Sequence, residues 1–211
     1  MKVGLELHRL IDTQKLFCKC YYKKENLEEV HQIGYPSINR SMKYYTSKNY
    51  CEYEIDQVPA QLNEKILQKA VRVVNQIPGV KLVPQIIFSR KKILDNSLPS
   101  GYQITGLLAY GGTIDLGHKK VQIDKIYLEQ DSCSVDKDGY KVDRLGLPLI
   151  QLTTLPLELQ SWEVVLLLKK IEYYLNYHRN LPINEFCRRQ DINVSIEGHE
   201  RVEIKGVTSL S

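Results

Sequence analysis

Glu6 and His8 are the first residues along the chain whose types and spacing could do chemistry. They lie in a segment in which every second residue from Val3 to Leu7 is apolar, a pattern that predicts a short strand. Side chains two residues apart on a strand point to the same face. A carboxylate and an imidazole placed in this way could share a divalent cation. The alternative is a solvated strand face, which the same pattern also fits.

A second acidic set, Glu129 and Asp131, follows a segment at 120–128 that is also expected to be a strand. Apolar Val121 and Ile123 alternate there with polar residues, which is typical of a sheet with one solvated face. Carboxylates at the end of a strand are well placed for Mg²⁺, which prefers one or two carboxylates together with waters and phosphate oxygens. A charged loop is the alternative interpretation.

Cys18 and Cys20 could form half of a zinc site. A structural zinc needs four ligands, commonly two close pairs. Cys51 is the candidate third ligand and His31 the nearby fourth, but Cys51 lacks a partner at Cys-x-x-Cys spacing. Free, partly buried thiols are the alternative. The odd total of 5 cysteines, with no signal peptide, indicates reduced thiols in a cytoplasm.

The overall charge permits a nucleic-acid partner without requiring one, because it is only +4 at pH 7. Short basic clusters are interleaved with 14 tyrosines, a combination that suits phosphate and base contacts. A charged, tyrosine-rich solvated surface is the alternative. No phosphate-binding glycine loop is visible, and the Gly111-Gly112 pair reads as a hairpin turn. The longest apolar run, 164–168, is far too short for a membrane span.

Periodicity places these residues on a small set of elements. Helices are expected from the Asn63 cap to about residue 76 and from Ser161 to about residue 178. Strands are expected at 3–8, 81–88, 103–110, 120–128 and 147–152, with a terminal hairpin formed by 192–196 and 202–204. The polar stretch 21–49 is expected to be mostly irregular. The sum is an α+β fold with antiparallel or mixed strands and two main helices.

Several strings, taken in order along the chain, resemble one family. They are VGLELH at 3–8, KLFCKC at 15–20, CEYEIDQVPAQLN at 51–63, YLEQD at 127–131, DRLGLPLI at 143–150, QDINVSI at 190–196 and RVEIKGV at 201–207. The match is collinear over essentially the whole chain, and two of the strings, DRLGLPLI and RVEIKGV, are specific. The sequence is similar to the opening part of the glutamyl-tRNA(Gln) amidotransferase B/E subunits, and closest to the archaeal E-type version.

The resemblance implies both a fold and a reaction. It implies that residues 1–211 form one partial, cradle-like kinase domain, apparently truncated, without the helical and tail domains of the family. Members of the family use ATP and Mg²⁺ to phosphorylate the side-chain carboxylate of Glu on tRNA(Gln), and ammonia then displaces the phosphate. The implied partners are an asparaginase-like amidase subunit of the D type, tRNA(Gln) and a separately encoded C-terminal half. The implied location is the cytoplasm.

The resemblance also implies roles for individual residues. Glu6, His8 and Glu129 match catalytic metal ligands. Neighbouring residues of the ATP pocket are Arg90, Tyr102, Gln103, Arg144 and Lys205. Two positions depart from the family pattern, because Gln130 and Gln151 stand where carboxylates are usual. An amide carbonyl can coordinate Mg²⁺ but lacks the charge that offsets dehydration of the ion, so weakened metal binding is expected.

Three hypotheses about function follow. The first is a catalytic subunit, or its N-terminal fragment, acting in Glu-tRNA(Gln) amidation. The second is a non-catalytic, decayed or split-gene relative that binds a partner subunit or tRNA without turnover. The changes at Gln130 and Gln151 favour the second hypothesis, whereas Glu6, His8 and Glu129 favour the first. The third, a zinc-stabilised RNA-binding module, rests on the paired cysteines and the basic, aromatic surface.

Overall fold

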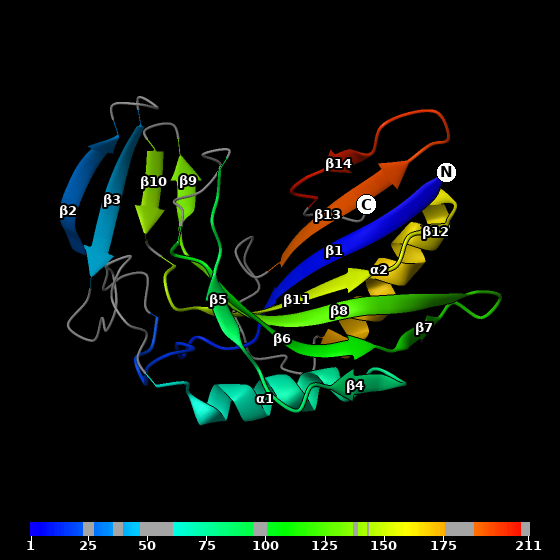
Figure 1. The fold of residues 1–211 in the computed structure, drawn as a ribbon, viewed down its shortest axis with the longest axis horizontal. Coiled ribbons are helices and arrows are strands. Elements are labelled where there is room, and N and C mark those ends of the chain that lie inside the picture. The colour runs from blue at the N-terminus through cyan, green and yellow to red at the C-terminus, as the bar shows by residue number, and fades with distance from the viewer. Residues whose placement is uncertain are drawn as a thin grey trace.

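The structure is a computed structural model that describes residues 1–22, 28–35, 40–46, 61–94, 101–136, 139–142, 144–175 and 188–207. Within these residues the chain forms two β-sheets and two helices (Figure 1). This arrangement confirms the α+β class and the two main helices expected from the sequence.

The larger sheet contains ten strands among the described residues. They are β1 (Lys2–Leu10), β4 (Val80–Leu82), β5 (Phe88–Arg90), β6 (Ile104–Gly111), β7 (Thr113–Asp115), β8 (Lys120–Gln130), β11 (Pro148–Thr154), β12 (Leu157–Glu158), β13 (Arg188–Ser195) and β14 (Val202–Ile204). The spatial order is β14-β13-β1-β11-β8-β6-β4, with β12, β5 and β7 attached to β1, β6 and β8. The recorded strand pairs of this sheet are antiparallel. The terminal hairpin predicted from the sequence is therefore confirmed as β13 and β14.

One predicted strand is divided in the structure. The stretch 81–88 was expected to be a single strand, but β4 ends at Leu82 and β5 begins at Phe88. Pro84 lies between them. Proline has no backbone N–H and cannot donate to a sheet ladder, so it interrupts a strand at this position.

The smaller sheet corrects a sequence-based expectation. It consists of β2 (Glu28–Tyr35), β3 (Arg40–Thr46), β9 (Ser134–Asp136) and β10 (Gly139–Val142), in the order β2-β3-β10-β9. The prediction that 21–49 is mostly irregular was therefore wrong. β3 pairs in parallel with β10, which lies far away in sequence. β2 and β3 also pair with each other as a local antiparallel hairpin, but their segments contain few of the aliphatic residues whose alternation marks a strand.

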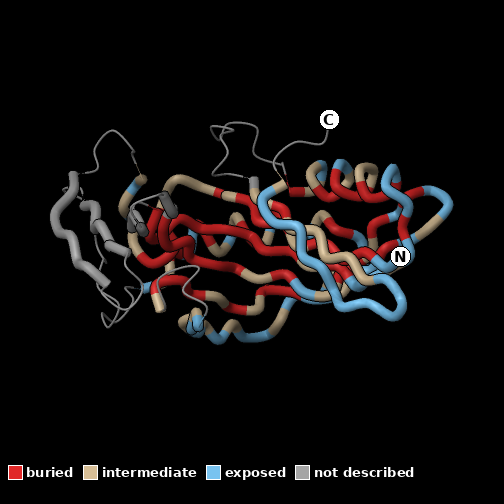
Figure 2. Tube along the Cα trace, turned by 90° about the horizontal axis from the view of Figure 1, so that it is seen from above, coloured by how far each residue is buried: buried red, intermediate tan, exposed pale blue. Residues whose placement is uncertain are grey.

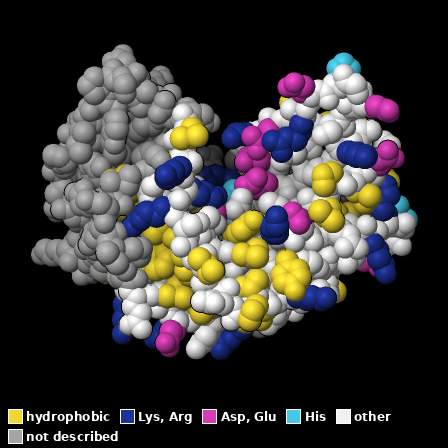
Figure 3. Space-filling model, in the orientation of Figure 1, with side chains coloured by type: hydrophobic (Ala, Val, Ile, Leu, Met, Phe, Trp, Pro, Cys, Tyr) yellow, Lys and Arg dark blue, Asp and Glu magenta, His cyan; other side chains and the backbone are white. Residues whose placement is uncertain are grey.

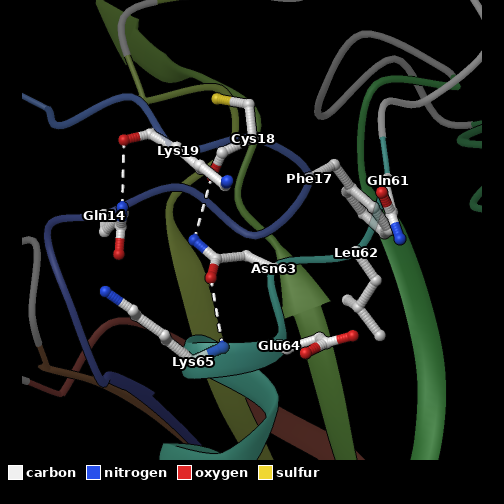
Figure 4. A pocket seen from close by; sticks show the side chains of 9 residues that line it. All are labelled: Gln14, Phe17, Cys18, Lys19, Gln61, Leu62, Asn63, Glu64 and Lys65. Carbon is white, nitrogen blue, oxygen red and sulfur yellow. Dashed lines mark hydrogen bonds between the residues drawn. The ribbon is translucent and has the colours of Figure 1, made fainter.

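The two helices begin where the sequence predicted. α1 spans Glu64–Val74, and the side chain of Asn63 accepts a hydrogen bond from the backbone N–H of Lys65 at 3.2 Å. The amide of Asn63 also donates to the carbonyl of Lys15 and to that of Cys18, the latter drawn in Figure 4, which joins the helix to the preceding loop. α2 spans Ser161–Leu175; the expected continuation to 178 lies outside the described residues. No described helix is both long and apolar enough to span a membrane.

Strand β1 separates the core from the candidate site. Val3, Leu5 and Leu7 are almost fully buried, and buried residues follow the central strands and the helix faces (Figure 2). Arg9, which lies on the same side of β1, donates to Glu172 of α2 at 2.9 Å. Because successive side chains alternate, Glu6 and His8 lie on the face of the sheet that points away from α2.

Candidate active site

Strand register brings Glu6, His8 and Glu129 to one face of the main sheet. His8 on β1 is opposite Gln151 on β11, and Leu149, two residues before Gln151, is opposite Glu129 on β8. Residues two apart share a face, so the two polar positions of β1 lie beside Glu129 across β11. The prediction that Glu6 and His8 point the same way is confirmed by their side-chain distance of 3.7 Å.

The imidazole of His8 lies between two carboxylates. Its Nε2 is 3.7 Å from Oε1 of Glu6 and 3.4 Å from Oε2 of Glu129. Its other nitrogen, Nδ1, is buried and has no hydrogen-bond partner among the described residues. Buried polar atoms are usually satisfied, so an unpaired ring nitrogen is unusual for a residue with a purely structural role.

Glu129 is the most deeply buried charge of the cluster, with none of its surface exposed. Its Oε1 pairs with Nζ of Lys91 at 2.6 Å, and its Oε2 accepts a hydrogen bond from Gln103 at 3.1 Å. Burial alone would raise the pKa of this carboxyl group, but the hydrogen bond from His8 and the charge of Lys91 outweigh burial and lower the pKa to about 2. Glu129 is therefore an anion at neutral pH.

Gln151 joins the cluster directly, because its side-chain amide donates to Oε1 of Glu6. The amide nitrogen must face the carboxylate, since the carbonyl oxygen would be repelled there. At this position the chain thus presents a hydrogen-bond donor to Glu6, where a carboxylate would have added a second negative charge.

Gln130 lies on the opposite face of the sheet from Glu129. Adjacent strand residues alternate in direction, and Gln130 is opposite Ile104, a core residue on β6. Its amide donates to the backbone carbonyl of Tyr102 at 3.1 Å, and both side chains are buried. The structure therefore separates Gln130 from the cluster, while it keeps Gln151 in contact with Glu6.

The expected ATP-pocket residues occupy different surroundings. Of these five residues, Gln103 is the one whose side chain hydrogen-bonds to Glu129 in the described part of the chain. Arg90 donates to the carbonyl of Gly101 at 2.9 Å, and the buried Arg144 donates to the carbonyl of Cys133. Lys205 follows the edge strand β14 and pairs with Glu203 at 3.2 Å.

Lys91 and Arg189 contribute to the site but were not singled out by sequence reasoning. Lys91 follows Arg90 in a basic cluster that also matches the family pattern, but it was given no role, and nothing local shows that it reaches Glu129. Arg189 is opposite His8 in the pairing of β13 with β1, and its guanidinium lies 3.5 Å from Oδ1 of Asp131. Both partnerships depend on strand register, which a single sequence does not display.

The donor types around His8 suit a divalent cation, because two carboxylates and an imidazole are common ligands. Metal ligands must be deprotonated, and the low pKa of Glu129 meets this requirement. As arranged, however, the Lys91 ammonium covers one oxygen of Glu129, and among the described residues no three His, Cys, Asp or Glu side chains are grouped to hold an ion. The residues therefore fit magnesium by type, while Lys91 occupies the Oε1 side of Glu129.

The zinc hypothesis gains no support from the described part of the chain. Cys18 and Cys20 are half-buried, and the backbone N–H of Cys20 donates to Sγ of Cys18 at 3.3 Å. Cys51 and the side chain of His31 lie outside the described residues. Cys18 lines a cavity of about 530 Å³ at the start of α1, together with Phe17 and other side chains (Figure 4). Zinc binding stays a prediction.

On one side of the molecule, acidic and basic side chains and a histidine gather at a hollow in its upper part (Figure 3). The polar face of the sheet, with its buried charged groups and an imidazole, is a candidate functional site of an α+β domain. Residues 1–211 match the model of the GatB/GatE catalytic domain, and the chain belongs to that family.

Curated relatives agree with this assignment. The chain is 33% identical to the E subunit of the glutamyl-tRNA(Gln) amidotransferase of Thermoplasma volcanium, with 100% of the chain and 39% of that protein aligned. It is 33% identical to the corresponding protein of Aeropyrum pernix and 30% identical to that of Archaeoglobus fulgidus, over 100% of the chain and 37% and 38% of those proteins. The chain thus spans less than two-fifths of the length of these relatives.

Proposed function

We propose that this chain carries the carboxylate-activating site of a tRNA-dependent amidotransferase that converts Glu-tRNA(Gln) to Gln-tRNA(Gln). In this proposal ATP phosphorylates the side-chain carboxylate of the glutamyl group, and ammonia from a separate, asparaginase-like amidase displaces the phosphate. Activation is necessary because a carboxylate oxygen is a poor leaving group and phosphate is a good one. The observation that supports the proposal is the cluster of Glu6, His8 and Glu129 in a chain that matches the family domain over its full length.

Magnesium, when bound, neutralises phosphate charge and orients an in-line transfer. Glu6, His8 and Glu129 are the residues that would hold it. Each is already positioned by β1 or β8, two neighbours of β11 at the centre of the sheet, so little backbone movement is needed. Gln103 keeps Glu129 oriented through its bond to Oε2.

Lys91 has a separate task in this proposal. Its ammonium neutralises Glu129 in the present arrangement, at 2.6 Å. When a cation binds Glu129, Lys91 becomes an unpaired positive charge beside the site. Such a group stabilises the negative charge that develops on the transferred phosphoryl oxygens.

The activation step can be tested without an amidase partner, because hydroxylamine attacks a glutamyl phosphate to give a stable hydroxamate. The full chain is incubated with Glu-tRNA(Gln), ATP, Mg²⁺ and hydroxylamine, and the γ-hydroxamate is quantified separately from the α-hydroxamate that hydroxylamine forms without ATP by cleaving the ester. We expect ATP-dependent product that falls at least about 100-fold in His8→Ala. The matched control is Lys81→Ala on the exposed strand β4. If the folded natural chain forms no hydroxamate, the proposal that it performs activation is wrong.

A further inference from the structure

A second polar hollow continues from Glu6 along the same face of the main sheet. It has a volume of about 200 Å³. Among the residues that line it are Lys2, Gly4, Glu6, Asn193, Ser195 and Arg201. We refer to this hollow as the Lys2 pocket.

Strand register explains why the pocket and the cluster are continuous. In the pairing of β1 with β13, Lys2 is opposite Ser195 and Gly4 is opposite Asn193. Lys2, Gly4 and Glu6 alternate with core residues and therefore share the face that carries His8. Gly4 supplies no side chain, so the space between Lys2 and Glu6 is left open.

Arg201 completes the far end of the pocket. β13 and β14 pair with Val194 opposite Val202, so the next position places Arg201 beside Ser195. Neither Lys2 nor Arg201 has a hydrogen-bond or ion-pair partner in the described part of the chain. One end of the pocket thus carries two cationic side chains.

Glu6 makes the other end negative. Its Oε1 faces His8 and accepts from Gln151, whereas Oε2 has no partner among the described residues. A strand rises about 3.3 Å per residue, so the backbone of Lys2 lies roughly 13 Å from that of Glu6. A ligand that fills this space meets a carboxylate at one end and two cations at the other.

We propose that the Lys2 pocket holds the aminoacyl end of the substrate, with the α-ammonium of the glutamyl group against Oε2 of Glu6 and the phosphate of the terminal nucleotide against Lys2 and Arg201. This inference rests on the proposed function. A glutamyl ester on a terminal ribose carries one free ammonium, and the nearest phosphate is separated from it by the ester and the sugar. Charge therefore matches at both ends of the pocket.

The same placement directs the reacting group. With the ammonium held by Glu6, the side-chain carboxylate of the bound glutamyl group extends toward His8 and Glu129, because these groups adjoin Oε1 of Glu6. A bare phosphate ion would instead meet the charge of Glu6, and an apolar ligand would leave both cations unpaired. The side chain of Asn193, which is opposite Gly4, lies between the two ends and suits the ribose hydroxyl.

The test uses a stable mimic, 3′-deoxy-3′-(glutamylamino)adenosine 5′-phosphate, in which an amide replaces the labile ester. Its affinity for the full chain is measured by calorimetry, alongside one mimic without the ammonium and one without the phosphate. We expect each deletion to weaken binding about tenfold, as the loss of one charge-assisted contact does. Arg201→Ala should weaken the complete mimic about tenfold and should not affect the mimic that lacks phosphate. Lys81→Ala should bind all three as the natural chain does.

A second variant fills the pocket without removing a charge. Gly4→Val adds a residue that strands favour, and its Cβ comes no nearer than 3.8 Å to another atom, so the backbone accepts a side chain at this position. We expect the mimic to bind at least about tenfold more weakly, with an unchanged thermal midpoint. Equal binding of all three mimics, or full affinity in Arg201→Ala and Gly4→Val, would overturn the inference. The hydroxamate assay reports separately on the proposed function, because it detects activation whether or not this pocket holds the nucleotide.

Discussion

Two glutamates of this chain are surrounded by the same kinds of residue and differ in how their charge is compensated. Glu129 and Glu163 are 0% and 2% exposed, and the pKa of each is lowered to about 2. Each faces a histidine and a lysine. For Glu129 these are His8 at 3.4 Å and Lys91 at 2.6 Å, and for Glu163 they are His118 at 2.7 Å and Lys119 at 3.0 Å.

Glu163 serves the fold. It lies in the first turn of α2, and its Oε2 accepts the backbone N–H of Gln160 at 2.7 Å, as in a capping box. This backbone hydrogen bond is the main cause of its low pKa, followed by those from His118 and Lys119. His118 and Lys119 lie in the turn between β7 and β8, so the glutamate ties that turn to the helix.

Glu129 has its charge compensated by side chains from other strands and loops. Burial opposes its ionisation, and His8 and Lys91 overcome that opposition. Side-chain partners can move away when a ligand binds, whereas a backbone cap cannot do so without unwinding the helix. Residue types alone therefore do not distinguish the two glutamates, whereas the origin of the compensating charge does.

The largest expected effect is a difference in activity between variants of Glu129 and Glu163. Glu129→Gln should lower hydroxamate formation about 1000-fold or more, because it removes a charge that the proposed metal site needs. Glu163→Gln should leave the rate of the folded protein unchanged. If both variants lose activity equally at matched folded fractions, the distinction between them is wrong.

Gln130 and Gln151, which lie on opposite faces of the sheet, provide the next test. Gln130→Glu should lower the free energy of unfolding by about 3 kcal/mol, because a buried carboxylate would face the carbonyl of Tyr102. Gln151→Glu should instead strengthen Mn²⁺ binding about tenfold, since it adds a carboxylate beside Glu6. Urea unfolding and calorimetry measure the two effects. Stronger Mn²⁺ binding by Gln130→Glu would contradict its position on the opposite face.

The dependence of the free energy of unfolding on pH should show that Glu129 is ionised in the folded protein. Its folded pKa of about 2 is below the ordinary value of 4.5, so its contribution is present above pH 4.5 and is lost as the pH falls toward 2. From pH 5 to pH 3 this group alone should lower the free energy of unfolding by about 2 kcal/mol. Urea titrations should show a shallower loss in Glu129→Gln. An identical slope in the two proteins would show that the carboxylate is not held as described.

The smallest expected effect concerns the helix cap. Glu163→Gln should lower the thermal midpoint by only about 2–4 °C, because the amide oxygen can still accept from Gln160 while the ion pair with Lys119 is lost. Differential scanning calorimetry measures the shift. A drop much greater than about 10 °C would mean that this glutamate holds more of the fold than one cap.

The sequence correctly predicted the helices and strands that are marked by a short-range pattern of residues. The alternation from Val3 to Leu7 predicted β1, and Asn63 predicted the start of α1. The alternation of side chains along a strand puts Glu6 and His8 on one face. The same alternation puts Gln130 on the other face of the sheet from Glu129. Sequence reasoning nevertheless treated these adjacent residues as one site.

Long-range pairing accounts for most of what the sequence did not reveal. The contact of Lys91 with Glu129 depends on the registers of β5, β6 and β8, and that of Glu163 with His118 depends on how α2 packs beside the turn after β7. The local hairpin of β2 and β3 was missed because its sequence is polar, whereas the parallel pairing of β3 with β10 joins distant segments. No local periodicity encodes such partners.

The most direct test of the central claim is a calorimetric titration of the chain with Mn²⁺, as a surrogate for Mg²⁺, in the presence of a non-hydrolysable ATP analogue. The natural chain, Glu129→Gln and Glu163→Gln are compared at pH 7. We predict saturable binding by the natural chain and by Glu163→Gln, and at least about 100-fold weaker binding by Glu129→Gln. Equal binding by all three proteins, or none by the natural chain, would contradict the claim that the cluster around His8 is the functional site.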